Sequence, residues 1–208
     1  MDTVQKIMSV ATDMFRQYGF KTITMDDIAR RAGISKKTLY QHFATKSDVV
    51  TASMNWFQKI VCDRCDEIEA DSDNAVEAMV RTMGMIEEMF RKINPLSMLE
   101  LQRFFPDAYT EFRTKHVARD IQSVADNIMR GTEEGYYREA LNADILARYR
   151  IESCMIMLQP NLLASTHNPQ AVNQEISENF LYGLMTAKGE RLYQKYKDKY
   201  LKRVPTIL

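Results

Sequence analysis

The amino-acid sequence predicts an all-helical protein. Gly (seven residues) and Pro (five residues) together fall to about half of their usual share. Met, Leu, Ala, Glu, Lys and Arg, which favour helices, are plentiful. No segment alternates apolar and polar residues in the way that a half-buried strand does. At 208 residues the chain is long enough to bury a core of its own, and we expect about nine helices.

Apolar periodicity and capping residues predict four helices in the first seventy residues, over the ranges 4–18, 24–32, 35–42 and 46–70. Gly19 ends the first helix, because a glycine accepts the left-handed backbone that follows a helix. Thr24 and Ser35 are residues whose hydroxyls cap helix N-termini, and Gly33 ends the second helix. The second and third helices are therefore both short.

The same signals predict the later helices over the ranges 76–93, 106–129, 143–158 and 169–201, with a short helix that ends at residue 105. Pro95 follows the end of the fifth helix, because the residue before a proline disfavours helical backbone. Pro106 suits the first turn of the long helix that follows it, where its missing N–H costs nothing. An Asn- and Pro-containing segment separates the last two helices.

The charge of the chain is uneven although its sum is zero. Lys plus Arg and Asp plus Glu each number 28, so the total indicates neither nucleic acid nor membrane as a partner. Residues 1–50, however, carry eight basic against five acidic residues, and the other 158 carry twenty against twenty-three. The positive end is therefore the first place to look for a polyanionic partner.

Several classes of protein are disfavoured by what the sequence lacks. Three cysteines form no even-numbered disulfide framework, and no apolar run reaches the roughly 18 residues of a membrane span. We expect a cytoplasmic protein with no membrane partner. No nucleophile elbow, phosphate loop or glycine-rich fingerprint is present, and the three histidines are too scattered for a metal site. We therefore expect no enzyme activity, no cofactor and no metal.

The segment from Thr24 to Lys46 has the spacing of a helix-turn-helix: two short helices separated by a three-residue turn that contains Gly33. Apolar residues of both helices can turn inward, and the small Ala29 and Ala32 let the helices cross closely. The alternative is a helical hairpin with a solvated basic face. Combined caps, turn and outward polar residues favour DNA binding, with these contact residues: Thr24, Met25, Ser35, Lys36, Lys37, Thr38, Tyr40, Gln41, His42 and Lys46.

The side chains on the third helix suit the chemistry of a DNA groove. Lysine can donate to guanine O6 and N7, and Gln41 can read adenine. The hydroxyls of Thr38 and Tyr40 can bond to phosphates and fix the register. For Lys36 and Lys37 a phosphate contact is favoured over a base contact, because most protein hydrogen bonds to DNA go to the backbone. Free amides at the starts of these helices can also receive phosphate oxygens.

The pattern TxxxIAxxAGxSxxTLYxHFxxK resembles the DNA-binding domain of the TetR family. It is carried by Thr24, Ile28, Ala29, Ala32, Gly33, Ser35, Thr38, Leu39, Tyr40, His42, Phe43 and Lys46. The resemblance covers about a quarter of the chain; beyond it, only the helix pattern and the segment EEGYYRE at 133–139 are similar. One departure is Lys37, where many members have glycine, and this lysine can add a base or phosphate contact.

The resemblance implies a helix-turn-helix domain over residues 1–46 and a helical effector-binding and dimerisation domain over residues 47–208. It further implies a homodimeric transcriptional repressor that binds palindromic operator DNA and is released by a small apolar or amphipathic effector. Two other classes stay open. One is a constitutive DNA- or protein-binding module without an effector, and the other is a small helical enzyme that borrowed the DNA-binding domain.

An effector pocket is predicted among methionines and aromatic residues of the central helices, because such side chains form adaptable apolar pockets. The alternative for each of them is an ordinary place in the core. The predicted pocket residues are Phe57, Val61, Met83, Ile86, Phe90, Phe104, Phe105, Phe112 and Met155.

A dimer interface is implied for the last two helices, whose apolar residues could pair across a twofold axis. The same residues could equally be ordinary core. The predicted interface residues are Ile151, Met155, Leu158, Phe180, Leu181 and Leu184. Cys62 and Cys65 form a C-x-x-C on a helix, without a second cysteine pair or a preceding strand, so we expect this pair to be inert.

Overall fold

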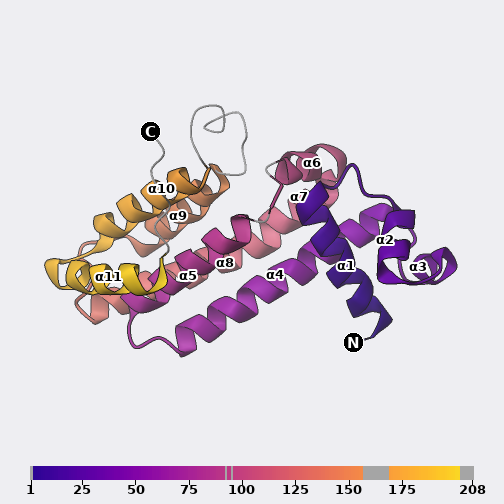
Figure 1. Ribbon diagram of the computed structural model, residues 1–208. Coiled ribbons are helices and arrows are strands. Elements are labelled where there is room, and N and C mark those ends of the chain that lie inside the picture. Colours follow the sequence, from indigo (N-terminus) through magenta and orange to yellow (C-terminus); the bar gives the residue numbers. More distant parts are fainter. Residues whose placement is uncertain (1, 92, 95, 157–168, 202–208) are drawn as a thin grey trace. The chain divides into compact units, whose positions relative to one another are not determined.

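A computed structural model describes residues 2–91, 93–94, 96–156 and 169–201 of the chain (Figure 1). Within these ranges the secondary structure is helical, and the one β-type contact is an isolated bridge between Tyr137 and Met185. The prediction of an all-helical fold is confirmed. The described part of the chain contains eleven α-helices and one π-helical turn, against about nine helices expected.

The chain divides into two compact units. The first consists of Met1–Cys62 and Lys92–His116, and the second of Asp63–Arg91 and Val117–Leu208. The predicted division between residues 46 and 47 lies inside the first unit, where α4 begins. The boundary at residue 46 therefore stays a prediction about where the DNA-binding part of the chain ends, and it does not coincide with a boundary between the two units.

The first unit contains the short N-terminal helices and a later pair of helices. Its elements are α1 (Thr3–Tyr18), α2 (Met25–Ala32), α3 (Lys36–His42), the first part of α4 (Lys46–Ala70), α6 (Ser97–Phe104), α7 (Pro106–Glu111) and the π-helical turn η1 (Phe112–His116). Asp2 begins α1 with a capping box, in which the amide of Gln5 donates to the Asp2 carboxylate at 2.7 Å. Gly19, with φ 84°, ends α1 where the sequence predicts its end.

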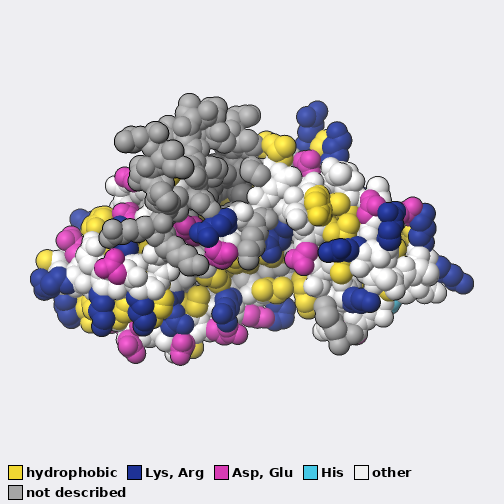
Figure 2. All heavy atoms as spheres, in the orientation of Figure 1, with side chains coloured by type: hydrophobic (Ala, Val, Ile, Leu, Met, Phe, Trp, Pro, Cys, Tyr) yellow, Lys and Arg dark blue, Asp and Glu magenta, His cyan; other side chains and the backbone are white. Residues whose placement is uncertain are grey.

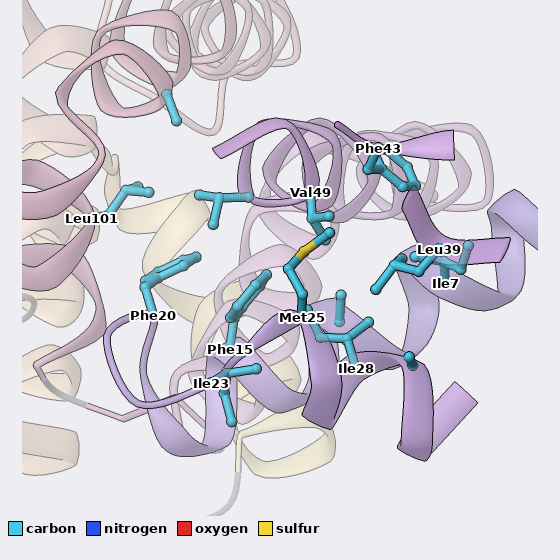
Figure 3. Packing of buried hydrophobic residues seen from close by; sticks show 14 residues of the cluster. Ile7, Phe15, Phe20, Ile23, Met25, Ile28, Leu39, Phe43, Val49 and Leu101 are labelled. Carbon is cyan, nitrogen blue, oxygen red and sulfur yellow. The ribbon is translucent and has the colours of Figure 1, made fainter. Parts of the chain in front are cut away.

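The core of the first unit is built from the inner faces of α1, α2, α3 and α4 (Figure 3). Phe15 from α1 stacks on Phe20 with 5.0 Å between ring centroids, and Ile28 from α2 and Leu39 from α3 are fully buried. Leu101 from α6 belongs to the same cluster. The burial of these side chains supplies the main force that fixes α3 on α1 and α2.

The second unit contains the end of α4 and five further helices: α5 (Ala75–Phe90), α8 (Val117–Glu133), α9 (Ala143–Ile156), α10 (Pro169–Leu184) and α11 (Ala187–Tyr200). Helix α8 packs on α9, and α5 packs against α11 and α8 (Figure 1). α5 ends at Phe90, three residues earlier than predicted.

The single helix predicted over residues 169–201 is wrong, because two helices occupy this range. Thr186 separates them as the N-cap of α11, accepting a hydrogen bond from the amide of Gly189 at 3.3 Å. The amide of Thr186 donates to the carbonyl of Tyr136 at 2.9 Å, so the break is also tied to the segment that follows α8.

A buried tyrosine organises the second core. The Tyr137 ring lies against Gly131, and its hydroxyl contacts the carbonyl of Ala75 and the side-chain oxygen of Asn127, each at 3.3 Å. Burial raises the pKa of this tyrosine above its ordinary value, so it stays a neutral hydrogen-bond donor. Tyr137 belongs to the EEGYYRE segment, which therefore has a structural role between α5 and α8.

Candidate nucleic-acid interface

The turn between α2 and α3 has the backbone that a helix-turn-helix requires. Gly33 adopts the left-handed conformation, with φ 63° and ψ 37°. Its amide donates to the carbonyl of Arg30 at 3.1 Å, and the amide of Ile34 donates to the carbonyl of Ala29 at 3.0 Å. The turn satisfies the last carbonyls of α2. Helix α3 therefore begins soon afterwards, at Lys36, three residues after Gly33.

Hydroxyl caps fix the starts of the helices around this turn. Thr24 accepts the Asp27 amide at 3.2 Å, while the Thr24 amide donates back to the Asp27 carboxylate at 3.1 Å. The hydrogen bond from the Thr24 hydroxyl is the main cause that lowers the pKa of the Asp27 carboxyl. Ser35 accepts the Thr38 amide at 3.0 Å at the start of α3. Both caps predicted from the sequence are present in the structure.

The inner and outer faces of α3 differ in the way that DNA recognition requires. Leu39 is fully buried against the core, which anchors the helix (Figure 3). The exposed side chains are those of Lys36, Lys37, Tyr40, Gln41 and His42, and Thr38 is half-buried. Lys and Arg side chains are visible on the surface formed by α2 and α3 (Figure 2). The first unit thus presents hydrogen-bond donors on the outer face of α3, while the inner face of this helix is anchored in the core.

Lys36 and Lys37 have different surroundings. Lys36 forms an ion pair with Asp26 in the first turn of α2. Lys37 is exposed, and within the described part of the chain no ion pair involves it. The sequence analysis did not identify Asp26 as a partner of Lys36. The available signal was its place in the first turn of a helix, where acidic residues are common and can pair with a nearby basic residue.

Lys46 joins the start of α4 to the segment before α2. Its ammonium donates to the carbonyl of Lys21 at 3.3 Å and lies 5.5 Å from the centre of the Phe105 ring. Burial lowers the pKa of this ammonium, while the carboxylates of Glu100 and Asp27 act in the opposite direction. The lysine is therefore held near the N-terminus of α2, where a phosphate contact was predicted.

Met25 differs from the other predicted DNA contacts in that its side chain is buried. The sequence reasoning included it among the DNA contacts, but its side chain is only 8% exposed and belongs to the core of the first unit. Being the first residue of α2, it has its backbone amide at the helix end while its side chain packs inward (Figure 3). A contact with DNA through the Met25 side chain is therefore excluded in this conformation.

The predicted pocket residues are divided between the two units. Phe57, Val61, Phe104, Phe105 and Phe112 lie in the first unit, and Met83, Ile86 and Met155 lie in the second. The Phe90 side chain lies outside what the structure describes. Phe104 is exposed, whereas Phe112 and Met83 are buried. A pocket formed by these residues stays a prediction.

The second unit has a cleft of about 270 Å³, counting the space that is open to solvent. It includes only Met83 from the predicted set, and both apolar and polar residues line it: Met83, Glu87, Asn173, Gln174, Ser177, Glu178, Leu181, Tyr193 and Leu201. Burial raises the pKa of the Glu87 carboxyl, although Arg91 opposes this effect. Only Met83 therefore connects this cleft with the pocket that the sequence predicts.

The predicted interface residues Phe180, Leu181 and Leu184 have buried side chains in the core of the second unit. Ile151 and Met155 are partly buried, and Leu158 lies outside the described residues. The three buried side chains are used within one copy of the chain. If α10 forms an interface, it does so through its other face.

Within the described residues no cluster of three or more His, Cys, Asp or Glu side chains could hold a metal ion. No helix in these ranges is both long and apolar enough to cross a membrane. Cys62 is buried and Cys65 is half-buried on α4, and neither forms a disulfide bond within the described residues.

The geometry around Gly33 defines the class of the protein: two short helices, a tight turn and exposed donors on the second helix form a helix-turn-helix DNA-binding domain. A sequence model of the family described as "Bacterial regulatory proteins, tetR family" matches residues 7–52, from within α1 to within α4. This part of the chain therefore matches the DNA-binding domain of that family, and the protein is a DNA-binding transcriptional regulator.

Comparisons with individual proteins agree with this assignment. The HTH-type transcriptional repressor KstR2 of Mycobacterium tuberculosis is 29% identical over 153 residues, which are 69% of this chain and 74% of KstR2. The fold resembles that of a TetR-family transcriptional regulator from Agrobacterium tumefaciens, with a TM-score of 0.73, 17% identity, and coverage of 88% of this chain and 98% of that chain. It also resembles FadR from Bacillus subtilis in complex with stearoyl-CoA, with a TM-score of 0.66, 14% identity, and coverage of 86% and 98%.

Proposed function

We propose that the protein is a homodimeric repressor that binds a palindromic operator and is released from it by a small-molecule effector. The observation that carries this proposal is the exposed donor face of α3, held on a fully buried Leu39 and begun by the Ser35 cap. In a dimer the two α3 helices would enter successive major grooves, about 34 to 36 Å apart along the DNA.

The donors have separate roles in this proposal. Lys37 has no competing ion pair in the described part of the chain, so it is the lysine most available to a phosphate or a guanine. Gln41 can read an adenine, and Tyr40 and Thr38 can bond to phosphates. Lys46, near the start of α2, adds positive charge where a phosphate would meet free amides.

A second copy would bind on the outer faces of α9 and α10. Three large apolar side chains are exposed there: Ile145 (61%) and Tyr149 (55%) on α9, and Tyr182 (42%) on α10. Ile145 and Tyr149 are four residues apart and therefore lie on one side of α9. Exposed apolar side chains that share a face are typical of protein interfaces, so they replace the buried residues as interface candidates.

The second unit would receive the effector. The structural neighbour FadR, whose structure contains stearoyl-CoA, supports a ligand-dependent mechanism for a chain with this fold. An effector releases the repressor only if it binds the DNA-incompetent conformation more tightly than the competent one. Repression rather than activation is favoured because KstR2, which matches 69% of this chain, is a transcriptional repressor.

The proposal is tested by measuring the binding of the purified protein to its own upstream DNA across a salt series from about 50 to 200 mM. A double variant, Lys37→Ala with Tyr40→Ala, removes two exposed donors from α3. As a control, Lys195→Ala removes one exposed positive charge from α11 in the second unit.

We expect the wild type and the control to bind specifically, with affinity that falls steeply with salt, and the double variant to lose specific binding. Equal binding by the double variant would show that α3 is not the reader. Specific binding that no small molecule changes would favour the alternative, a constitutive DNA-binding module without an effector.

A further inference from the structure

Arg150 on α9 is the one cationic side chain that is buried among the described residues. It is only 4% exposed, whereas the other buried charged residues in these ranges, Glu77 and Glu87, are acidic. Both acids have cationic partners: Lys199 contacts Glu77 at 3.9 Å, and Arg91 contacts Glu87 at 3.4 Å. Arg150 differs from them in its surroundings.

No carboxylate neutralises Arg150 within the described part of the chain. Its Nη1 atom is buried without a hydrogen-bond partner, and no ion pair involves the residue there. Its guanidinium carbon lies 5.7 Å from the centre of the Phe180 ring on α10, which is a weak attraction at most. Two charged residues of α9 lie two positions from Arg150: Arg148 is exposed and paired with Asp144 at 3.0 Å, and Glu152 is exposed.

The other groups close to Arg150 do not supply a counter-charge. Burial raises the pKa of the Cys154 thiol, one turn further along α9, so this thiol stays neutral despite the opposite effect of Arg150. Ser153 uses its hydroxyl to donate to the carbonyl of Arg150 at 2.7 Å. Asp120 on α8 acts electrostatically on Cys154, but it forms no ion pair with Arg150.

A guanidinium cannot escape this situation by losing its proton, because arginine stays charged in proteins. Burying an unpaired charge is costly, and buried arginines are normally matched by an anion. The planar guanidinium suits carboxylate and phosphate oxygens, which accept two parallel hydrogen bonds from it. An oxyanion from outside the described residues would satisfy the free Nη1 atom.

We propose that Arg150 binds the anionic headgroup, a carboxylate or a phosphate, of an amphipathic effector. The aromatic rings of Phe180 and Tyr149, whose centroids are 6.3 Å apart, then contact the apolar part of the ligand. This inference rests on the proposed function, in which the second unit receives the effector, and it names the chemistry of that effector.

Burial of Arg150 also connects the ligand to the proposed dimer. The Nη1 atom of the guanidinium is buried, so a ligand reaches this atom only when the side chains around it move. Arg150 directly follows Tyr149, and its neighbour Phe180 lies two residues from Tyr182. Both tyrosines are on the exposed faces where the second copy would bind. Entry of an anion would therefore shift the two helices that carry the proposed interface.

The test compares ligands that share one chain length and differ in charge. Octanoate and octyl phosphate carry the two candidate headgroups, octanol is neutral, and octylamine is cationic. Binding of each to the full-length protein is measured by calorimetry without DNA. The wild type should bind one or both anions at least about tenfold more tightly than octanol or octylamine, because only an anionic headgroup accepts a charge-assisted hydrogen bond from the Arg150 guanidinium.

Three variants separate the charge from the packing. Arg150→Met should weaken anion binding at least about tenfold, Arg150→Lys should retain part of it, and Arg148→Met on the exposed side of α9 should leave it unchanged. Arg150→Met should also unfold at a temperature equal to or above that of the wild type, because it removes an unpaired buried charge. A purely structural arginine would give a lower unfolding temperature.

The proposal is overturned if the wild type binds the four octyl compounds equally, or if Arg150→Met binds the anions as tightly as the wild type. It is also overturned if Arg150→Met abolishes the dimer in light scattering and no anion binds, because the counter-charge then comes from the second copy. Operator binding is measured separately on the same samples. If the wild type does not bind the operator, the proposed function is contradicted, whatever the result with the anions.

Discussion

Lys36 of α3 forms an ion pair with Asp26 of α2, so a lysine of the recognition helix is held by an acid before any DNA is bound. Both side chains are largely exposed, and such a pair contributes little to stability. A phosphate that takes the place of Asp26 must first break this contact. Asp26 thus limits how much of the Lys36 charge is available to DNA.

We therefore expect Asp26→Asn to raise operator affinity, by about two- to fivefold at low salt, without changing stability by more than about 0.5 kcal/mol. The variant releases Lys36 and removes a negative charge next to the DNA. Asp13→Asn, an exposed position on α1, gives the same change in net charge as a control. Equal gains from both variants would mean that only total charge matters and that the Lys36 contact does not.

Gly33 is required for the turn because its φ is 63°, a conformation that side chains with a Cβ disfavour. An added Cβ would meet only the Lys6 ammonium at 3.8 Å, so there is no clash and the cost is conformational. Gly33→Ala should lower the free energy of unfolding by about 1 to 2 kcal/mol. Gly33→Asn should cost less, because asparagine tolerates this conformation; equal losses in chemical denaturation would contradict the explanation.

The DNA-binding end was the part of the molecule that the sequence predicted well. Thr24, Gly33 and Ser35 act on neighbouring residues, so their caps and turn follow from the local sequence and are found in the structure. The outward position of Lys37 follows from helical periodicity around Leu39. The inward side chain of Met25 did not follow from the sequence, because at the first residue of a helix position alone does not tell whether a side chain points inward.

The second unit was predicted less well, because its features depend on contacts between distant residues. The break at Thr186 relies on the carbonyl of Tyr136, fifty residues earlier, which no local pattern indicates. Leu181 has the same apolar character whether it faces a partner or its own core, so the sequence left both open. The unpaired state of Arg150 can be recognised only when its neighbours in space are known.

Gly131 and Tyr137 provide a test of the second core. A Cβ on residue 131 would lie 2.1 Å from the Tyr137 ring, which is buried and cannot move aside freely. Gly131→Ala should therefore cost about 3 kcal/mol, while Tyr137→Phe, which removes only the hydroxyl, should cost about 1 kcal/mol. Thermal unfolding measures both changes. If Gly131→Ala unfolds like the wild type, the ring is not confined as described.

His116 makes stability depend on pH. Burial lowers its pKa, although Glu111 opposes the effect, and its Nε2 atom contacts the side-chain oxygen of Asn55 at 2.8 Å. The unfolded chain thus takes up a proton more readily than the folded chain. The stabilisation is fully present above the ordinary histidine pKa of about 6.5, and it is lost as the pH falls from there through the lower folded pKa.

Denaturant unfolding at about pH 7.5 and about pH 5.5 should therefore show a loss of stability at the lower pH. His116→Gln keeps a polar group that can reach Asn55 but does not titrate, so part of this loss should disappear. Other ionisable groups still titrate in the variant. An unchanged difference between the two pH values would assign the whole effect to those groups rather than to His116.

Substitutions on the exposed face of α9 and on the buried face of α10 should have opposite effects on dimerisation and on stability. Tyr149 is 55% exposed, so Tyr149→Glu should leave the fold intact and place a charge in the proposed dimer interface. Leu181 is fully buried in the core, so Leu181→Ala should lower the free energy of unfolding by about 2 to 5 kcal/mol. Light scattering measures the mass of each variant, and thermal unfolding measures its stability.

We expect Tyr149→Glu to be a folded monomer that has lost most of its operator affinity, because a single α3 helix reads only one half-site. Leu181→Ala should remain dimeric wherever it is folded, since its side chain does not reach the outer face. Two results would contradict this assignment: a dimeric Tyr149→Glu, or a folded monomeric Leu181→Ala. The second would return the interface to the apolar residues that the sequence first indicated, and α10 would then have to turn its buried face toward the partner.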